Sequence, residues 1–181
     1  MPAPVAIPFF SGSGHTRRLA KAVAEGMDAA RLIDVEMITA EDWAALDAAP
    51  AILFGTPTYM GSSAARFDAF LEEASSRWPE QLWAGKLAGG FTVATYPSGD
   101  KLNTLMRLVI YATQMGMLWI GPNAIGAPVD ATRPGINRDG AMLGLMATSS
   151  RDKTHLIDSE DRETARLYGA RVTQAVQHFR I

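Results

Sequence analysis

Short apolar runs alternate along the chain with longer segments of helical periodicity. Residues 5–10, 51–54 and 117–120 are apolar and are followed by glycine or serine, which is typical of buried strands. Residues 32–38 alternate apolar and acidic side chains and predict a more exposed strand, and residues 87–95 predict a glycine-containing one. The pattern therefore predicts five strands, although Pro8 is awkward in the first because proline cannot donate to a sheet ladder.

Between these runs, apolar residues recur every three or four positions and predict helices. Thr39 with Asp42 three positions later predicts a capping box, and Gly116 is a natural helix stop. Residues 122–150, rich in glycine, proline and small polar residues, predict a long loop. The expected helices are residues 16–27, 39–46, a segment capped by Ser62 or Ser63 and bounded by Pro79, residues 102–115, and residues 159–179.

Alternation of five strands with about five helices predicts an α/β fold. We expect a three-layer sandwich, with helices on both faces of a five-stranded parallel sheet, formed as a single domain by residues 1–181. In sheets of this type ligands bind beyond the carboxyl ends of the strands. The residues that follow each predicted strand are therefore the candidates for function.

Composition narrows the possible functions. The chain has 181 residues, 48% of them hydrophobic and 20% charged, which is ordinary for a globular protein. The 17 basic and 19 acidic residues give a net charge of −2, so the basic patch that nucleic acid requires is not expected. The chain contains no cysteine, which excludes disulfides, thiolate metal sites and cysteine nucleophiles, including those of cysteine phosphatases.

Neither export nor membrane insertion is expected. The N-terminus has no basic segment followed by an apolar run of signal-peptide length. Residues 108–129 contain no charged side chain, which is long enough to raise the question of a membrane helix. Their glycines, prolines and polar residues instead predict a helix end, a strand and a loop. We therefore expect a cytoplasmic protein.

The segment after the first strand predicts a phosphate site. It consists of Ser11, Gly12, Ser13, Gly14, His15 and Thr16. Hydroxyls, glycine-freed backbone N–H groups and a helix N-terminus bind phosphate without a formal positive charge. Arg17 stands where a dinucleotide fingerprint would need its third glycine, and the Gly-Lys-Ser/Thr of a P-loop is absent. An ordinary glycine-rich turn with hydroxyl caps remains the alternative.

Two further strand ends carry an aromatic residue each. The first comprises Pro57, Thr58, Tyr59, Met60 and Gly61, and suits the cover of a flat heteroaromatic ring. The second comprises Thr95, Tyr96, Pro97, Ser98 and Gly99. Each could also be a plain connection, with its tyrosine packed on the domain. Three such loops at one edge of the sheet indicate a ligand site more specifically than any one of them does.

These segments resemble a known family. Residues 10–26, 54–61 and 85–91, with the closing helix at 158–179, are similar to those of flavodoxin-like flavoproteins. The closer resemblance is to WrbA-type NAD(P)H:quinone oxidoreductases and NADPH-dependent FMN reductases. It implies the strand order 2-1-3-4-5 and bound FMN. The first segment would hold the FMN phosphate, and the segments around Tyr59 and Tyr96 would contact its isoalloxazine ring. Trp78 would lie near the substrate.

The resemblance has departures. Tyr59-Met60 stands where WrbA-type proteins have Arg-Phe, Tyr96-Pro97 interrupts a glycine-rich loop, and Thr113-Gln114 replaces a histidine pair. These differences leave FMN binding intact but weaken the case for quinone specificity.

The resemblance also implies an activity. NADH or NADPH would pass two electrons through FMN to a quinone or similar flat acceptor, with no catalytic side chain required because the cofactor supplies the chemistry. A homo-oligomer is expected, with residues 122–150 as a candidate contact. Two alternatives stay open: a flavodoxin that carries single electrons between protein partners, and a binding module of the same fold that has lost the flavin.

Overall fold

A parallel sheet forms the middle of the molecule in a computed structural model that describes residues 4–150 and 155–179. Its strands lie in the order β2-β1-β3-β5-β6, and all neighbours in that order run parallel. This is the order 2-1-3-4-5 that the family resemblance implies, and the α/β sandwich is confirmed. The strands are β1 (Val5–Phe9), β2 (Ala30–Asp34), β3 (Ala51–Tyr59), β4 (Ser62–Ser63), β5 (Leu87–Ala94), β6 (Leu118–Trp119) and β7 (Leu145–Thr148).

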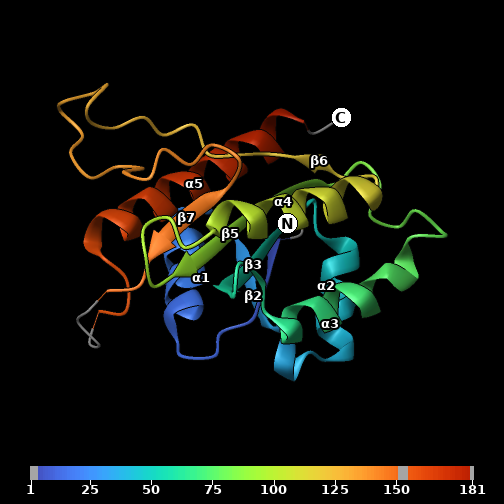
Figure 1. The fold of residues 1–181 in the computed structure, drawn as a ribbon. Helices are drawn as coiled ribbons and strands as arrows, with labels where there is room; N and C mark the ends of the chain where they lie inside the picture. Colours follow the sequence, from blue (N-terminus) through green and yellow to red (C-terminus); the bar gives the residue numbers. More distant parts are fainter. Residues whose placement is uncertain (1–3, 151–154, 180–181) are drawn as a thin grey trace.

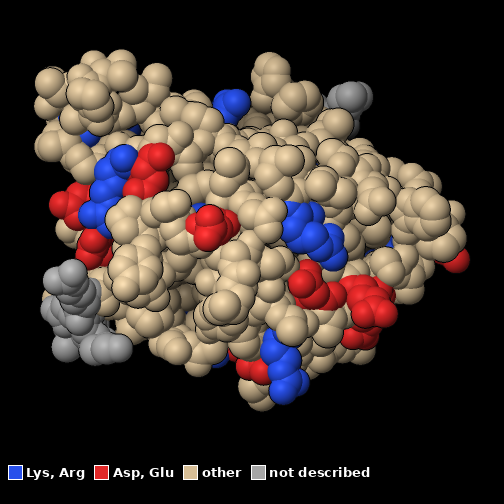
Figure 2. Space-filling view, in the orientation of Figure 1, with Lys and Arg blue, Asp and Glu red and all other residues tan. Residues whose placement is uncertain are grey.

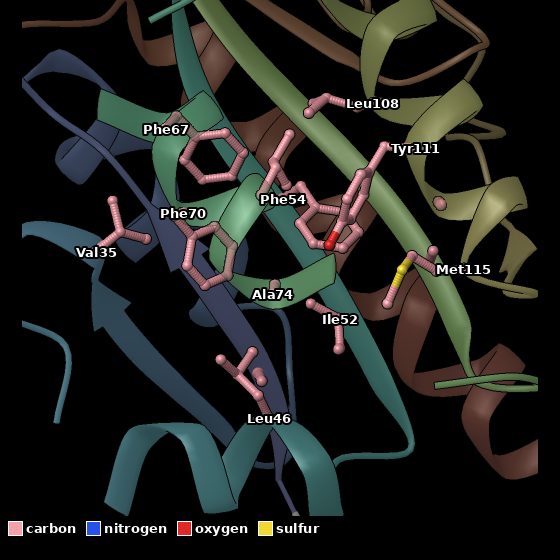
Figure 3. Packing of buried hydrophobic residues seen from close by; sticks show 14 of the residues in the cluster. Val35, Leu46, Ile52, Phe54, Phe67, Phe70, Ala74, Leu108, Tyr111 and Met115 are labelled. Carbon is pink, nitrogen blue, oxygen red and sulfur yellow. The ribbon is translucent and has the colours of Figure 1, made fainter. Parts of the chain in front are cut away.

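Helices cover both faces of the sheet (Figure 1). The helices α1 (His15–Ala24) and α5 (Ser159–His178) share one apolar cluster with β1, in which Leu19 and Tyr168 are buried. The helices α2 (Ala40–Ala48), α3 (Ala65–Ala74) and α4 (Lys101–Gln114) cover the other face. On that face the aromatic rings of Phe54, Phe67, Phe70 and Tyr111 gather between the sheet and the helices (Figure 3). The two clusters bury the apolar faces that the sequence pattern predicts.

The fifth position of the sheet is divided between two strands. β6 pairs with the start of β5 and β7 pairs with its end, both in parallel. The chain leaves the sheet after Trp119 and returns at Leu145. The predicted long loop over residues 122–150 is therefore found as far as residue 144, whereas residues 145–148 form the strand β7, which was not predicted. We call residues 121–144 the insertion. At the break, the buried Tyr168 hydroxyl accepts a bond from the Gly90 N–H (3.2 Å) and donates to the Ile120 carbonyl (2.7 Å).

Several element boundaries differ from the sequence prediction. β2 ends at Asp34, because the Asp34 carboxylate accepts a bond from the Glu36 N–H and starts the 3₁₀ helix η1 (Val35–Met37). β3 continues five residues beyond the predicted end, and its last residues pair with Ser62–Ser63 in a short antiparallel hairpin. Neither Ser62 nor Ser63 caps α3, whose N-cap is Ala64. Pro8 lies inside β1 despite its missing N–H.

Other local predictions are confirmed. Thr39 and Asp42 form the reciprocal bonds of a capping box at the start of α2. Gly116 follows the end of α4 with a φ of 74°, a backbone conformation that favours glycine. Across the ranges that the structure describes, every helix is too short or too polar to cross a bilayer. Residues 108–129 form the end of α4, β6 and the start of the insertion.

Candidate functional site

A pocket of about 150 Å³ lies at the carboxyl ends of β1, β3, β5 and β7. In Figure 1 the arrows of β5 and β7 point to the left of the view, and in Figure 2 the same side of the molecule is hollowed. The pocket collects residues from four separate parts of the sequence. They are Ser11, Gly12, Ser13, His15, Thr16, Pro57, Thr58, Tyr59, Val93, Ala94, Thr95 and Ser149.

The first loop reaches the pocket as a cradle at the start of α1. Gly14 adopts a φ of 92°, which turns the chain into the helix without the strain a side chain would suffer. The Ser11 hydroxyl accepts a bond from the Arg17 N–H at 3.0 Å and so caps the first turn. Arg17 itself pairs with Asp34 at 2.6 Å. None of the described residues that line the pocket is acidic, so nothing opposes an anion at this helix N-terminus.

Tyr59 lies close to the first loop at Gly12. A Cβ at this position would lie 2.6 Å from the Tyr59 hydroxyl oxygen, so a side chain at residue 12 would push the end of the Tyr59 side chain away from the loop. Tyr59 also packs edge-on against Phe10, with ring centroids 6.5 Å apart. The hydroxyls of Ser13 and Thr16 line the same space. A hydroxyl-lined cradle at a helix N-terminus fits the phosphate end of FMN.

The second segment is a rigid strand end rather than a free loop. The Thr58 hydroxyl lies 2.8 Å from the hydroxyls of both Thr92 and Thr104, in a buried cluster that ties β3 to β5 and α4. Beyond it the chain turns sharply, with positive φ at Met60 (49°) and Gly61 (81°). The Gly61 carbonyl accepts a bond from the Asn103 side chain at 2.7 Å. Tyr59 is half-exposed and Met60 is fully exposed.

The third loop is divided between two cavities. Thr95 lines the pocket described above, whereas Pro97 and Ser98 line a neighbouring cavity. Tyr96 is 72% exposed. Gly99 turns the chain with a φ of 50°, where a Cβ would lie 2.7 Å from that of Ala94. The third loop therefore lies between the two cavities and contributes residues to both.

The structure does not bring Trp78 to the pocket. Trp78 follows the 3₁₀ helix η2 (Ser75–Arg77) at the C-terminal end of α3, whereas α3 begins beside the pocket edge of β3. Its side chain is 54% exposed. Met60, Gly61 and Gly14 border the loops without lining the pocket.

Sequence reasoning missed three lining residues. Val93 and Ala94 were assigned to a strand interior, but they reach the pocket because they are the last residues of β5. Ser149 directly follows β7, and it could have been found only by recognising a strand within the predicted loop. The apolar run before Ser149 is short, and it is the only signal for that strand.

A polar network supports β7 from behind. The fully buried Lys101 ammonium donates to Asp139 (2.5 Å), to the Ala147 carbonyl (3.2 Å) and to Thr148 (3.3 Å). The Thr148 N–H donates to Asp161 at 2.8 Å. Burial raises the pKa of Asp161, although this amide and nearby Arg138 act to lower it. The network fixes the strand end that carries Ser149.

Fold and pocket together define a flavodoxin-like protein with a hydroxyl-lined pocket at the first strand end. Residues 39–131 match the family model described as NADPH-dependent FMN reductase. Flavodoxin FldP of Pseudomonas aeruginosa (strain UCBPP-PA14) is 39% identical over 178 residues, covering 96% of both chains. The chain belongs to this family of flavodoxin-like, FMN-binding oxidoreductases.

Further relatives divide between two functional names. The NAD(P)H dehydrogenase (quinone) of Rhodopseudomonas palustris (strain BisA53) is 30% identical over 142 residues, covering 67% of this chain and 71% of that protein. Among solved structures, a flavodoxin, WrbA-like protein from Agrobacterium tumefaciens superposes with a TM-score of 0.78 at 39% identity, covering 98% of this chain and 99% of that one. The family resemblance drawn from the sequence is thus confirmed.

Proposed function

We propose that this protein binds FMN in the pocket and passes two electrons from NADH or NADPH to a quinone or a similar flat acceptor. The first-loop residues named above would hold the FMN phosphate. The segments 57–61 and 95–99 would flank its isoalloxazine ring. When bound, FMN supplies the electron-transfer chemistry, and the protein supplies binding, orientation and exclusion of water.

The exposed apolar rim of the pocket carries this proposal. Tyr59 is 47% exposed, Tyr96 is 72% exposed and Met60 is fully exposed, at the ends of two strands that border the pocket. Large apolar side chains that stay in water beside a pocket mark a place where another apolar surface binds. Tyrosine rings stack on flat ligands, so the rim suits a nicotinamide or quinone ring.

The reaction balances without a catalytic side chain. NAD(P)H loses two electrons and one proton and becomes NAD(P)⁺, and the quinone gains two electrons and two protons to become a hydroquinone. The second proton comes from the solvent. The role of the chain is to place donor and acceptor in turn against the same ring.

An electron carrier is the second candidate, because the 39% identical relative that matches 96% of this chain is named a flavodoxin. A carrier of this kind exchanges single electrons with protein partners. Homo-oligomer formation stays a prediction from the family resemblance, and a cytoplasmic location stays a prediction from the sequence.

Anaerobic mixing of FMN-loaded protein with NADH or NADPH separates the two candidates. We expect one nicotinamide to bleach the flavin absorbance, and 1,4-benzoquinone to restore it with one hydroquinone formed per nicotinamide oxidised. If neither nicotinamide bleaches the flavin, and dithionite titration accumulates one-electron-reduced flavin, the carrier replaces the reductase.

The rim is tested by Tyr96→Ala. An aromatic contact worth roughly 0.5–1.5 kcal/mol predicts a loss of about two- to thirteenfold in kcat/KM for the quinone. Val129→Ala is the control, since Val129 is 82% exposed but lies in the insertion and lines neither the pocket nor the cavity beside the third loop. An equal effect of the two substitutions would contradict the assignment of the rim.

A further inference from the structure

A second, larger cavity of about 650 Å³ lies beside the third loop. The loop forms one wall, the first two turns of α4 form another, and residues 139–146 of the insertion and β7 form the third. Its volume falls within the range of small-molecule sites, roughly 300–1,000 Å³. Most of this cavity lies outside the pocket in which we place FMN.

The walls of this cavity are mainly apolar and adaptable. Leu102 and Met106 come from α4, and Met142, Leu143 and Met146 come from the other side. Met106 is 45% exposed and Met142 is 49% exposed, which is high for apolar side chains of this size. Methionine side chains are flexible and polarizable, so they can pack against apolar ligands of varied shape.

The charged residues that line the cavity are Lys101 and two acids, Asp100 and Asp139. Among the described residues that line it, Lys101 is the one cation, and it is fully buried and paired with Asp139. The N-terminus of α4 also borders the cavity, but its N-cap residue Asp100 places an exposed carboxylate in the same lining, which repels the phosphates of a dinucleotide such as NADPH. The view of this side of the molecule shows a mostly uncharged middle that contains an acidic patch, between charged margins (Figure 2). The cavity therefore suits a neutral, apolar ligand.

The cavity is next to the proposed redox site. Pro97 and Ser98 line it, and Thr95, two residues earlier in the same loop, lines the phosphate pocket. The exposed Tyr96 lies between them in sequence. A ligand with a ring at the pocket rim and a flexible substituent can thus cross the third loop into the cavity.

We propose that this cavity binds the apolar chain of a tailed quinone whose ring reacts at the FMN site. The proposal rests on the proposed function for the identity of the ring, but the cavity and its apolar walls do not depend on it. It makes Met106 and Met142 determinants of acceptor specificity. Quinones with an alkyl chain would then be better acceptors than the same ring without one.

Binding is tested without any turnover, by displacement of N-phenyl-1-naphthylamine from the FMN-loaded protein. This neutral probe fluoresces in apolar sites. We expect decylubiquinone to displace it at a concentration at least tenfold lower than 2,3-dimethoxy-5-methyl-1,4-benzoquinone, which has the same ring and no chain. Absence of probe binding, or equal displacement by both quinones, would overturn the proposal.

Variants locate the site. Met106→Glu and Met142→Glu place a charge in the apolar wall, and each should raise the half-displacing concentration of decylubiquinone at least tenfold. Met142→Gln should act in the same direction with a smaller effect and less risk to folding. Met37→Glu is the matched control, because Met37 is 78% exposed on η1 and lines neither cavity. An equal effect of the control would overturn the assignment.

Turnover gives an independent comparison. The ratio of kcat/KM for decylubiquinone to that for the tail-less quinone should fall at least tenfold in Met106→Glu and Met142→Glu, and stay unchanged in Met37→Glu. If neither quinone is reduced while decylubiquinone still displaces the probe, the proposed reductase activity fails and the apolar-chain site stands. If both are reduced with a ratio that no variant changes, the reductase stands and the apolar-chain site fails.

Discussion

Two hydroxyl side chains of the first loop are expected to carry much of the FMN affinity. Ser13 and Thr16 line the pocket beside the N-terminus of α1. A hydrogen bond to a charged group contributes about 1.5–3 kcal/mol, so Ser13→Ala with Thr16→Ala should weaken FMN binding by roughly 100-fold or more. Quenching of FMN fluorescence on titration with apoprotein measures the Kd.

A second double variant, which removes two hydroxyls outside the pocket, is the control. The exposed Ser76 hydroxyl donates to the Glu73 carbonyl and accepts a bond from neighbouring Arg77, and the exposed Thr113 hydroxyl donates to carbonyls of its own helix. Ser76→Ala with Thr113→Ala should leave the Kd within about twofold, because surface substitutions of this kind change little. A first-loop double variant that binds FMN as tightly as the unaltered chain would refute the phosphate site.

The first loop could be predicted because its chemistry is local. Hydroxyls, glycines and a helix start within six consecutive residues indicate a phosphate cradle by themselves. Ser149 could not be predicted, since it reaches the pocket only through β7. That the third loop lines two cavities could not be predicted either. Pro97 and Ser98 line the second cavity together with the insertion, and the sequence does not show which side of a loop a distant segment covers.

The start of α2 makes a pH-dependent contribution to stability. Asp42 accepts bonds from the Thr39 N–H and hydroxyl, and from Arg31 at 2.7 Å. Partial burial alone would raise the pKa of Asp42, but the bonds from Thr39 and Arg31 outweigh it and hold the pKa below the usual value. A carboxyl with a lower pKa in the folded state stabilises the fold at neutral pH, and this contribution is lost as pH falls through its folded pKa.

Asp42→Asn should therefore lower the free energy of unfolding by about 1 kcal/mol at pH 7, the usual size of a lost helix cap. The difference from the unaltered protein should persist to about pH 5 and shrink below about pH 4, where the carboxyl becomes protonated. Urea unfolding followed by circular dichroism across this range measures it. Glu41→Gln, on the same turn and exposed, is the control, and the expectation fails if both variants show the same pH dependence.

Helices were predicted more closely than strand ends. The period of apolar residues and caps such as Thr39 are encoded within one helix. The end of β3 depends instead on neighbours, because the Thr58 hydroxyl bonds to Thr92 and Thr104, far away in the sequence. β2 stops at Asp34 for a local reason, an aspartate cap, but the alternating pattern of residues 32–38 obscured it.

The insertion is joined to the rest of the molecule by a buried ion pair. Lys101 at the start of α4 is fully buried and contacts Asp139 of the insertion at 2.5 Å, with Ala147 and Thr148 of β7 as its other partners. Three segments that are distant in sequence thus meet at one ammonium group. The sequence shows a lysine after a turn and an aspartate in a loop, and neither pattern indicates that they pair.

Breaking this pair tests how far the insertion supports the pocket. Asp139→Ala leaves the Lys101 ammonium buried with only neutral partners, which should cost about 3–5 kcal/mol of unfolding free energy by urea denaturation. Lys101→Met with Asp139→Ala removes the stranded charge and should recover most of that loss, since an apolar replacement of a buried pair is often nearly neutral. Amide hydrogen exchange in β7 should accelerate in the single variant and return in the double one. Because Ser149 directly follows β7 and lines the pocket, FMN affinity should fall in the single variant and recover in the double one. An FMN affinity that stays unchanged in Asp139→Ala would show that the pair stabilises the fold without supporting the pocket.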